Sequence, residues 1–490
     1  MIKRNLIIGI VWSILIFNIG CSHKEHQLEV NNVEMIEHIV EAYDHLHGFS
    51  GNVLVGHKDS IIYQSTSGFS DYDQQFPNAA DTKFRLASLS KQFTATALLL
   101  LEQNGKVDFE SPVSDYVETL KPEIGNVITI HQILSHSSGL GRDIESLTDD
   151  ELGKSYISLD SIITLINTSE LQFEPGSKWS YSNLGYAIAA KIIENRTGLP
   201  YGDALGSLIF KPLGMKHSGH EVSNTEISNL AIGHVGLPDK VVEAAYEDKS
   251  YVSGAGSIYS TVGDLFIWAR AIMNGKLINH ENRNKLFEKQ SGRYSYGWFI
   301  GTYVWPPVND DNQALNIHHD GGSPGFECKL SLLIEHEIVV IVLSNKLPSN
   351  YNMLANQITN SILGFEESPP RKNGNIQFFK MLFEEGISST ISLKEEWEST
   401  DKSYLLPPTS NVFMIGRGYM DIHDYEKAHL IMDYLIKVKP KWSYPYLFKA
   451  IMSEEEGQNN KAIELYSKVL EVEPGQSNAT VRLKKLKEDL

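Results

Sequence analysis

Two strand hairpins near opposite ends of one long region constrain the fold of this chain most strongly. Residues 52–56 and 61–64 are separated by a short polar turn, and so are residues 330–334 and 338–343. The last of these segments, Ile-Val-Val-Ile-Val-Leu, is apolar throughout, as expected of a central strand covered on both faces. Helical patterns lie between the hairpins. We therefore predict an α+β domain over residues 35–365, with an antiparallel β-sheet closed by both ends of the domain and flanked by helices, plus an all-helical region.

The first 21 residues have the pattern of an export signal. Lys3 and Arg4 precede an uncharged run, which as a helix reaches only about 24 Å and falls short of a bilayer core of about 30 Å. Cys21 follows at once, and this arrangement resembles a bacterial lipoprotein signal, in which the cysteine is lipidated. We expect residues 22–34 to be a polar tether and the protein to lie in the bacterial cell envelope, lipid-anchored and facing the periplasm or exterior. An uncleaved anchor helix is the alternative.

The C-terminal part of the chain contains an internal period. Two residue types recur 34 positions later, which pairs Ala428 with Ala462 and Pro440 with Pro474. The pattern resembles the tetratricopeptide repeat, a two-helix unit in which small residues allow close helix contact. We expect such α-helical repeats over residues 406–490, after a linker with some helix at 366–405, where helical material at 376–399 supplies a cap. An unrelated helical hairpin is the alternative.

A serine and a lysine three residues apart form the first candidate catalytic motif. Ser88-Leu-Ser-Lys91 precedes an Ala- and Leu-rich stretch that stops at Gly105, so we expect Ser88 at a helix start. Positions i and i+3 share one helix face, which places the Lys91 amine near the Ser88 hydroxyl. Serine needs a neighbouring base to become a nucleophile, and a desolvated lysine can be that base. Ser399 and Lys402 have the same spacing in the charged linker, where we expect no activity.

The second motif is Tyr181-Ser-Asn183. A phenol deprotonated by nearby cations can accept the serine proton and hand it to a leaving group. The Asn183 amide could hold Lys91 and a substrate carbonyl. The alternative is a tyrosine that only caps the preceding Pro-Gly turn.

The third motif is His319-Asp-Gly321-Gly322. We expect its glycines at the start of a strand, where a substrate can approach the backbone closely. An N–H group there, with the N–H of Ser88, could form an oxyanion hole. A plain glycine turn is the alternative.

The three motifs occur together in one order, and residues 35–365 resemble the serine β-lactamase and penicillin-binding protein superfamily. The similar branch contains class C β-lactamases, DD-peptidases, D-aminopeptidases and esterases. Supporting stretches are residues 134–140, 212–215 and 254–260.

This resemblance implies an acyl-enzyme on Ser88, with Lys91 and Tyr181 shuttling the proton. It implies that Asn183 positions groups, that the N–H groups of Ser88 and Gly322 bind the oxyanion, and that neither a cofactor nor a metal is needed. Many members that recognise a substrate carboxylate have lysine where this chain has His319. A histidine with a pKa of about 6.5 is mostly neutral at pH 7 and holds an anion less firmly.

The charge and the cysteine content exclude several classes of protein. The net charge of −18 argues against a nucleic-acid partner, which requires a basic face. Two cysteines exclude a disulfide scaffold and a cysteine-rich zinc module, and we expect Cys328 to be a small buried residue.

The leading hypothesis is a serine hydrolase that acts on a small-molecule or peptide substrate, as an ester, an amide or a D-amino-acid peptide. One alternative is a receptor that is acylated without turnover and senses β-lactams or cell-wall fragments. Another is a scaffold whose repeats bind a protein partner. Because no motif lies in residues 406–490, we expect their removal to spare hydrolysis of a small ester.

Overall fold

The structure is a computed structural model that describes residues 30–144, 153–221, 223, 225–303, 314–364, 371–400 and 404–488. The predicted signal with Cys21 and residues 22–29 of the predicted tether lie outside these residues. Residues 30–34, also expected in the tether, instead form the start of a helix, Val30–His47.

A six-stranded antiparallel sheet forms the centre of the larger domain, in the order β10-β11-β12-β13-β1-β2. Its strands are β1 (Gly51–His57), β2 (Ser60–Ser67), β10 (Phe299–Tyr303), β11 (Ala314–Ser323), β12 (Phe326–Leu333) and β13 (Ile338–Ser344). The two predicted hairpins are β1–β2 and β12–β13, and β1 pairs with β13. The two ends of the domain therefore meet inside one sheet, and the prediction of an α+β fold is confirmed.

Strand β13 is buried along its whole length, as its apolar sequence predicts. Its side chains alternate between two hydrophobic cores: Val339 and Ile341 belong to one core, and Val340 and Val342 belong to the other. A one-residue slip in its pairing would exchange these two sets, so the pattern fixes the register.

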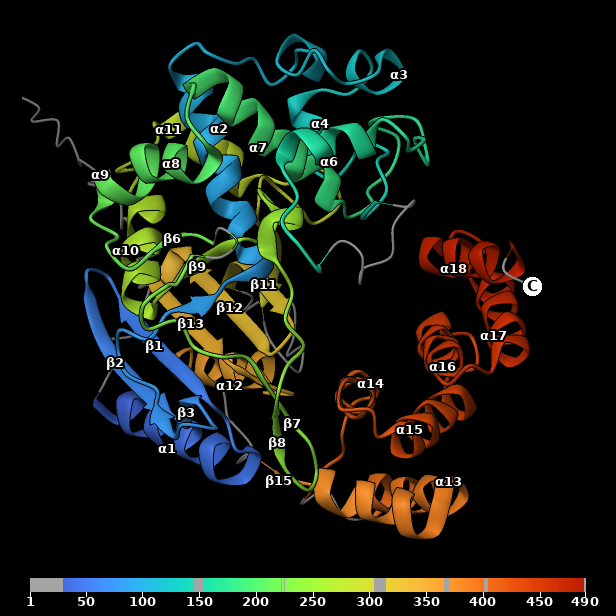
Figure 1. Ribbon diagram of the computed structural model, residues 1–490. Coiled ribbons are helices and arrows are strands. Elements are labelled where there is room, and N and C mark those ends of the chain that lie inside the picture. Colours follow the sequence, from blue (N-terminus) through green and yellow to red (C-terminus); the bar gives the residue numbers. More distant parts are fainter. Residues whose placement is uncertain are drawn as a thin grey trace, which may run out of the picture.

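Helices cover both faces of the sheet (Figure 1). The second core lies under α1 (Val30–His47) and α12 (Tyr351–Ile362), which pack against each other. On the opposite face, α10 (Val262–Met273) crosses β1 so closely that a Cβ at Gly56 would lie 2.1 Å from the Phe266 ring. A side chain at this crossing would displace the Phe266 ring.

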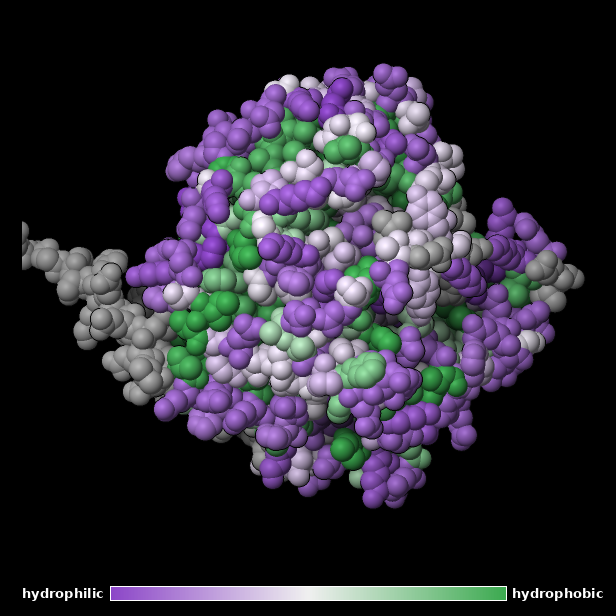
Figure 2. Space-filling view, turned by 60° about the vertical axis from the view of Figure 1, so that its left-hand side comes forward, coloured by the Kyte–Doolittle hydropathy of each residue, from purple (hydrophilic) through white to green (hydrophobic). Residues whose placement is uncertain are grey.

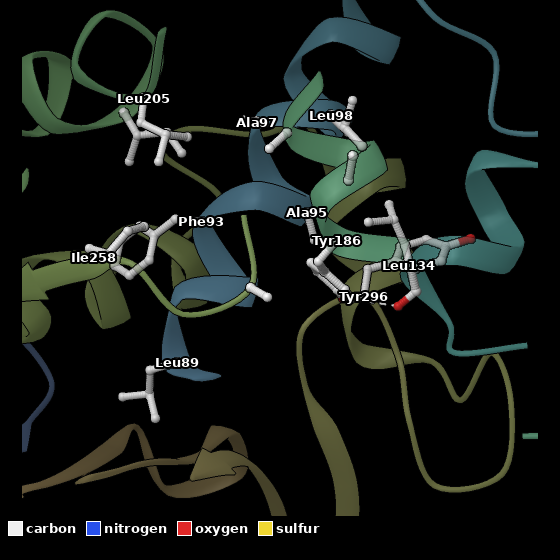
Figure 3. Close-up of a cluster of buried hydrophobic side chains, with 14 of the residues drawn as sticks. Leu89, Phe93, Ala95, Ala97, Leu98, Leu134, Tyr186, Leu205, Ile258 and Tyr296 are labelled. Carbon is white, nitrogen blue, oxygen red and sulfur yellow. Dashed lines mark hydrogen bonds between the residues drawn. The ribbon is translucent and has the colours of Figure 1, made fainter. Parts of the chain in front are cut away.

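Helix α2 (Ser90–Gln103) runs through the middle of the helical region, and every residue from Ser90 to Leu101 is buried. Figure 3 shows hydrophobic side chains gathered around it, with Phe93 and Leu98 from the helix itself. The other helices of this domain are α3 (Pro122–Gly125), α4 (Ile130–Leu134), α6 (Leu159–Ile166), α7 (Asn183–Thr197), α8 (Tyr201–Leu205), α9 (Lys211–Leu213) and α11 (His280–Phe287). Because α2 is held on all sides, the residues at its N-terminus have fixed positions.

Short strands connect these layers. They are β3 (Phe69–Asp71) with β4 (Phe76–Pro77), β5 (Phe84–Arg85) with β9 (Ile258–Ser260) and β6 (Gly219–His220), and β14 (Lys346–Leu347) with β7 (His234–Gly236) and β8 (Val241–Glu243). Two further short strands, β15 (Lys372–Asn373) and β16 (Tyr404–Leu405), pair with each other beyond the domain.

The C-terminal region is entirely helical apart from β15 and β16 in the part that the structure describes, and it curves beside the larger domain (Figure 1). Its helices are α13 (Asn375–Ser399), α14 (Thr409–Asp421), α15 (Tyr425–Val438), α16 (Ser443–Glu455), α17 (Asn459–Val472) and α18 (Ser477–Glu488). The starts of α14, α16 and α18 are 34 residues apart, and so are those of α15 and α17. The segment expected to be a linker with some helix holds α13, which packs on α15. The assignment to the tetratricopeptide class stays a prediction.

The face of the molecule in Figure 2 is mainly hydrophilic, with hydrophobic side chains in separate smaller groups. Within the described ranges, no helix is both long enough and apolar enough to cross a membrane.

Candidate active site

Ser88 lies in a short 3₁₀ turn, η1 (Ala87–Leu89), that leads directly into α2. The preceding Ala87 has a φ of +46°, an uncommon conformation for a residue with a side chain. At its other end, α2 stops before Gly105, whose φ is +65°. The predicted helix start and helix end are both confirmed.

Lys91 lies one turn along from Ser88 and is completely buried. Its amine is 3.2 Å from Ser88 Oγ, 2.8 Å from Asn183 Oδ1 and 2.9 Å from the carbonyl oxygen of Ala255. All three neighbours are neutral. Burial, reinforced by the positive charge of Arg142, therefore holds the pKa of Lys91 well below its usual value, although Asp143 opposes the change.

Tyr181 approaches Ser88 from the loop before α7, and its hydroxyl donates to Ser88 Oγ at 2.8 Å. The Lys91 amine lies 4.7 Å from the centre of the Tyr181 ring, and the Arg142 guanidinium lies 5.1 Å from it. Burial nevertheless outweighs the hydrogen bond to Ser88 and the charge of Arg142 and raises the pKa of Tyr181. The expectation of a deprotonated phenol is wrong for this state, because desolvation penalises the phenolate more than the Arg142 charge favours it.

Asn183 is the first residue of α7, and the preceding Ser182 caps the helix by accepting from the Gly185 N–H. The Asn183 amide oxygen accepts from Lys91, and its nitrogen donates to Asp143 Oδ1 at 2.8 Å. The predicted contact with Lys91 is present, and the carboxylate fixes which way the amide points.

His319 lies on β11 with its ring buried. Its Nε2 is 3.1 Å from the Tyr294 hydroxyl, and its Nδ1 is 2.6 Å from the carbonyl oxygen of Asp320. Burial is the main cause, and nearby Lys91 a further one, of a His319 pKa lowered to about 3. His319 is therefore neutral at pH 7, as expected, and both ring nitrogens already have partners.

Gly321 and Gly322 lie near the end of β11, not at a strand start. The sequence pattern was misleading here, because the turn at Pro324 and Gly325 joins β11 to β12 and the glycines precede it. A Cβ at Gly321 would lie 2.1 Å from the carbonyl oxygen of Leu86, so glycine lets β11 approach the segment that carries Ser88. At Gly322 a Cβ would meet no atom within 4 Å.

A pocket of about 580 Å³ opens at Ser88. Among the described residues that line it are Ser88, Asn183 and Gly322, whereas Lys91, Tyr181, His319 and Gly321 are not on its wall. The structure thus brings the three motifs together in two layers, with a nucleophile at the surface and proton-handling groups behind it.

Sequence reasoning missed four residues of this site. Two of them, Arg142 and Asp143, come directly after the 134–140 stretch. The third is Tyr294, whose hydroxyl contacts His319. The fourth is His136, whose ring lies 4.3 Å from that of Tyr181. None of them has a spacing that would indicate a role. The stretch around His136 was noticed only through its resemblance.

Two further observations concern metals and Cys328. No group of three or more His, Cys, Asp or Glu residues able to hold a metal occurs in the described ranges. Cys328 is buried on β12, as predicted, with its sulfur 3.0 Å from the carbonyl oxygen of Leu86.

Comparison with known proteins assigns the larger domain. A sequence model of the Beta-lactamase family matches residues 36–360. Penicillin-binding protein 4* of Bacillus subtilis (strain 168) is 28% identical over 347 residues, covering 65% of this chain and 73% of that protein. The putative penicillin-binding protein PbpX of the same organism is 30% identical over 298 residues, covering 61% and 71%.

The fold is also found in a solved structure, D-amino acid amidase from Ochrobactrum anthropi SV3 complexed with D-phenylalanine. That structure has a TM-score of 0.58 and 24% identity, covering 68% of this chain and 98% of the amidase. The family match extends over the whole six-stranded sheet and includes all three motifs. This chain therefore belongs to the Beta-lactamase family, within the superfamily of serine β-lactamases and penicillin-binding proteins.

Proposed function

We propose that this protein is a serine hydrolase that forms an acyl-enzyme on Ser88 and then releases the acyl group to water. One observation carries the proposal. Ser88 Oγ lies within hydrogen-bond distance of both the buried Lys91 amine, at 3.2 Å, and the Tyr181 hydroxyl, at 2.8 Å. A nucleophile that touches a base and a second proton carrier is the arrangement that acyl transfer requires.

The contacts of Lys91 support its role as the base. A neutral amine has two N–H donors and one lone pair. If the donors serve Asn183 Oδ1 and the Ala255 carbonyl, the lone pair is left for Ser88 Oγ. In the first step Lys91 takes the serine proton while Oγ bonds to the substrate carbonyl carbon. The carbonyl oxygen becomes an oxyanion, for which we propose the backbone N–H groups of Ser88 and Gly322.

Collapse of this intermediate breaks the bond to the leaving group, which needs a proton. We assign that proton to the Tyr181 hydroxyl, because its pKa is raised and it is therefore protonated. The proton held by Lys91 then restores the phenol. Water repeats the sequence in the second half. Lys91 takes the water proton while the water oxygen bonds to the acyl carbonyl carbon, and the Tyr181 hydroxyl then gives its proton to Ser88 Oγ as the bond between Oγ and that carbon breaks. The proton held by Lys91 again restores the phenol.

The substrate class is an ester, an amide or a D-amino-acid peptide. Two relatives are named penicillin-binding proteins and a protein of the same fold is named a D-amino acid amidase, which supports a small-molecule or cell-wall-derived peptide substrate. His319 is neutral, so a carboxylate on the substrate would need a different cation to hold it.

Time-resolved intact mass spectrometry tests the proposal. The chain from residue 22 is mixed with penicillin and, separately, with an activated aryl ester, and Ser88→Ala is the control. The proposal expects an adduct that requires Ser88 and decays with time. An adduct that persists with both reagents would instead indicate a receptor, and no adduct with either would overturn acyl transfer at Ser88.

We also propose that Cys21, which lies outside the described residues, carries the lipid that anchors the protein in the cell envelope. Incorporation of labelled palmitate into the wild type but not into Cys21→Ala is the expected result. Equal labelling of the two would contradict it.

A further inference from the structure

The C-terminal helices contact the catalytic domain directly. Helix α14 lies beside β7 (Figure 1). A Cβ at Gly418 would be 2.7 Å from Val235 Cγ1 and 2.9 Å from Leu237 Cδ2. Val235 and Leu237 share one hydrophobic core with α13, α14 and α15. The absent side chain at Gly418 is therefore what lets α14 approach the domain.

Polar contacts hold both ends of α14 in place. Near its start, Asn411 donates to Asn350 Oδ1 at 3.0 Å. Near its end, the Tyr419 hydroxyl donates to Asp239 Oδ1 at 3.0 Å, and Lys427 of α15 lies 3.3 Å from Asp239 Oδ2. The position of α14 relative to Ser88 is consequently defined by contacts on two segments of the catalytic domain, residues 235–239 and Asn350.

One pocket is lined by both parts of the chain. Ser88, Asn183 and Gly322 line it from the catalytic domain, and Arg417, Tyr444 and Phe448 line it from α14 and α16. Its volume of about 580 Å³ lies within the range typical of small-molecule sites, about 300–1,000 Å³. A molecule whose reactive carbonyl is at Ser88 would therefore extend toward the C-terminal helices.

Arg417 is the cation that α14 contributes to this wall. Its guanidinium lies 4.9 Å from the centre of the Phe448 ring and is half-buried. Among the described residues, no hydrogen-bond acceptor or carboxylate partners it. Of the other three cations in the lining, Arg142 pairs with Asp143 and Lys249 with Glu247, whereas Lys154 forms no ion pair with a described residue. A guanidinium stacked on a ring keeps its N–H donors at the edge of its plane, where a carboxylate can accept two of them.

We propose that Arg417 is a specificity-determining residue that binds an anionic group of the substrate, remote from the scissile carbonyl. This inference rests on the proposed hydrolase function and adds a substrate class to it: esters, amides or peptides that carry a carboxylate. His319 on β11 is neutral, whereas α14 contributes the cation Arg417 to the pocket that opens at Ser88.

The test uses the full chain and two pairs of aryl esters. Within each pair one ester carries a carboxylate and the other a carboxamide of the same shape, and the two pairs place this group on the acyl side or on the leaving-group side. Wild type, Arg417→Gln and the matched control Lys437→Gln, an exposed cation on α15 outside the pocket, are compared by kcat/KM.

Arg417→Gln should lower kcat/KM for the carboxylate member of one pair by about tenfold or more and change its carboxamide partner by less than about twofold. Lys437→Gln should change neither. An unchanged carboxylate-to-carboxamide ratio in both pairs would overturn the role of Arg417.

Failure of the proposed function gives a different result, namely no Ser88-dependent turnover of any of the four esters by the wild type. In that case, calorimetry of ester binding tests whether Arg417 binds the carboxylate, because binding does not require turnover. Weaker binding of the carboxylate esters, but not of the carboxamides, to Ser88→Ala/Arg417→Gln than to Ser88→Ala would support the proposal. Equal binding to the two variants would overturn it.

Discussion

The side-chain amide of Asn183 donates to the carboxylate of Asp143 at 2.8 Å while its oxygen accepts from Lys91 at 2.8 Å. The Asp143 carboxylate thereby orients the Asn183 amide, which in turn holds the buried Lys91 amine. The same carboxylate raises the pKa of Lys91, whereas Arg142 lowers it. Two neighbouring residues of opposite charge therefore act on one amine in opposite directions.

Replacing Asp143 or Arg142 should move the acidic limb of the pH profile of kcat/KM. The neutral form of Lys91 is the active base, so activity falls as the pH drops through its pKa. Asp143→Asn removes the charge that raises this pKa and should shift the limb of kcat/KM to lower pH. Arg142→Gln removes a charge that lowers it and should shift the limb to higher pH. Profiles that move together, or not at all, would contradict the assignment of Lys91 as the base.

Tyr181→Phe should lower kcat by about 10²- to 10⁴-fold, because the leaving group loses its proton donor. The melting temperature should change by only a few degrees, since phenylalanine fills the same space. Tyr186→Phe is the matched control: its buried hydroxyl donates to the carbonyl oxygen of Leu134 at 3.0 Å instead of to Ser88. This control should cost about 1 kcal/mol of stability and retain most of the activity. Equal kinetic effects of the two changes would count against a proton-transfer role.

His319 should make the protein less stable in acid. Its pKa is about 3 in the folded state, against about 6.5 when unfolded, so the unfolded state binds more protons between these values. The free energy of unfolding therefore falls as the pH drops below 6.5, by about 2 kcal/mol at pH 5 from this residue. Melting temperatures from pH 7.5 to pH 4.5 should fall less steeply for His319→Gln than for the wild type. Parallel curves would show that folding does not change the pKa of His319.

Gly418→Val should loosen α14 from the catalytic domain, because its side chain would overlap those of Val235 and Leu237. We expect a loss of about 1–3 kcal/mol in stability and faster amide hydrogen exchange in residues 409–421. Hydrolysis of a small neutral ester should persist, in agreement with the expectation that residues 406–490 are dispensable for it. Gly475→Val, where a Cβ would meet no atom within 4 Å, should leave the exchange of α14 unchanged. Unaltered exchange in Gly418→Val would mean that this contact does not hold α14.

The sequence predicts those parts of the fold that depend on local patterns. The apolar run of β13, the polar turn after His57 and the stop at Gly105 each act over a few residues, and each lies where it was expected. The contact between Ser88 and Lys91 follows in the same way from the pitch of a helix.

The missed features depend on contacts between distant segments. Asp143 meets Asn183 only because α4 and α7 pack together, and Gly418 meets Val235 only because α14 lies on β7. The expectation of a deprotonated Tyr181 fails for a related reason. Spacing reveals which cations are near a phenol, but only the packed structure shows how completely water is removed from it.

The pairing of β1 with β13 also determines when this protein can fold. Ser50 and Asn345, at the ends of these strands, share a buried hydrogen bond of 2.9 Å across 295 residues of chain. A ribosome therefore releases the β1–β2 hairpin long before its partner strand exists. A two-stranded hairpin is barely stable in water, and its open edge invites pairing with other chains. Until residue 344 has been synthesised the domain has no complete sheet, so the nascent chain needs protection from aggregation for almost the whole time that its catalytic part is being translated.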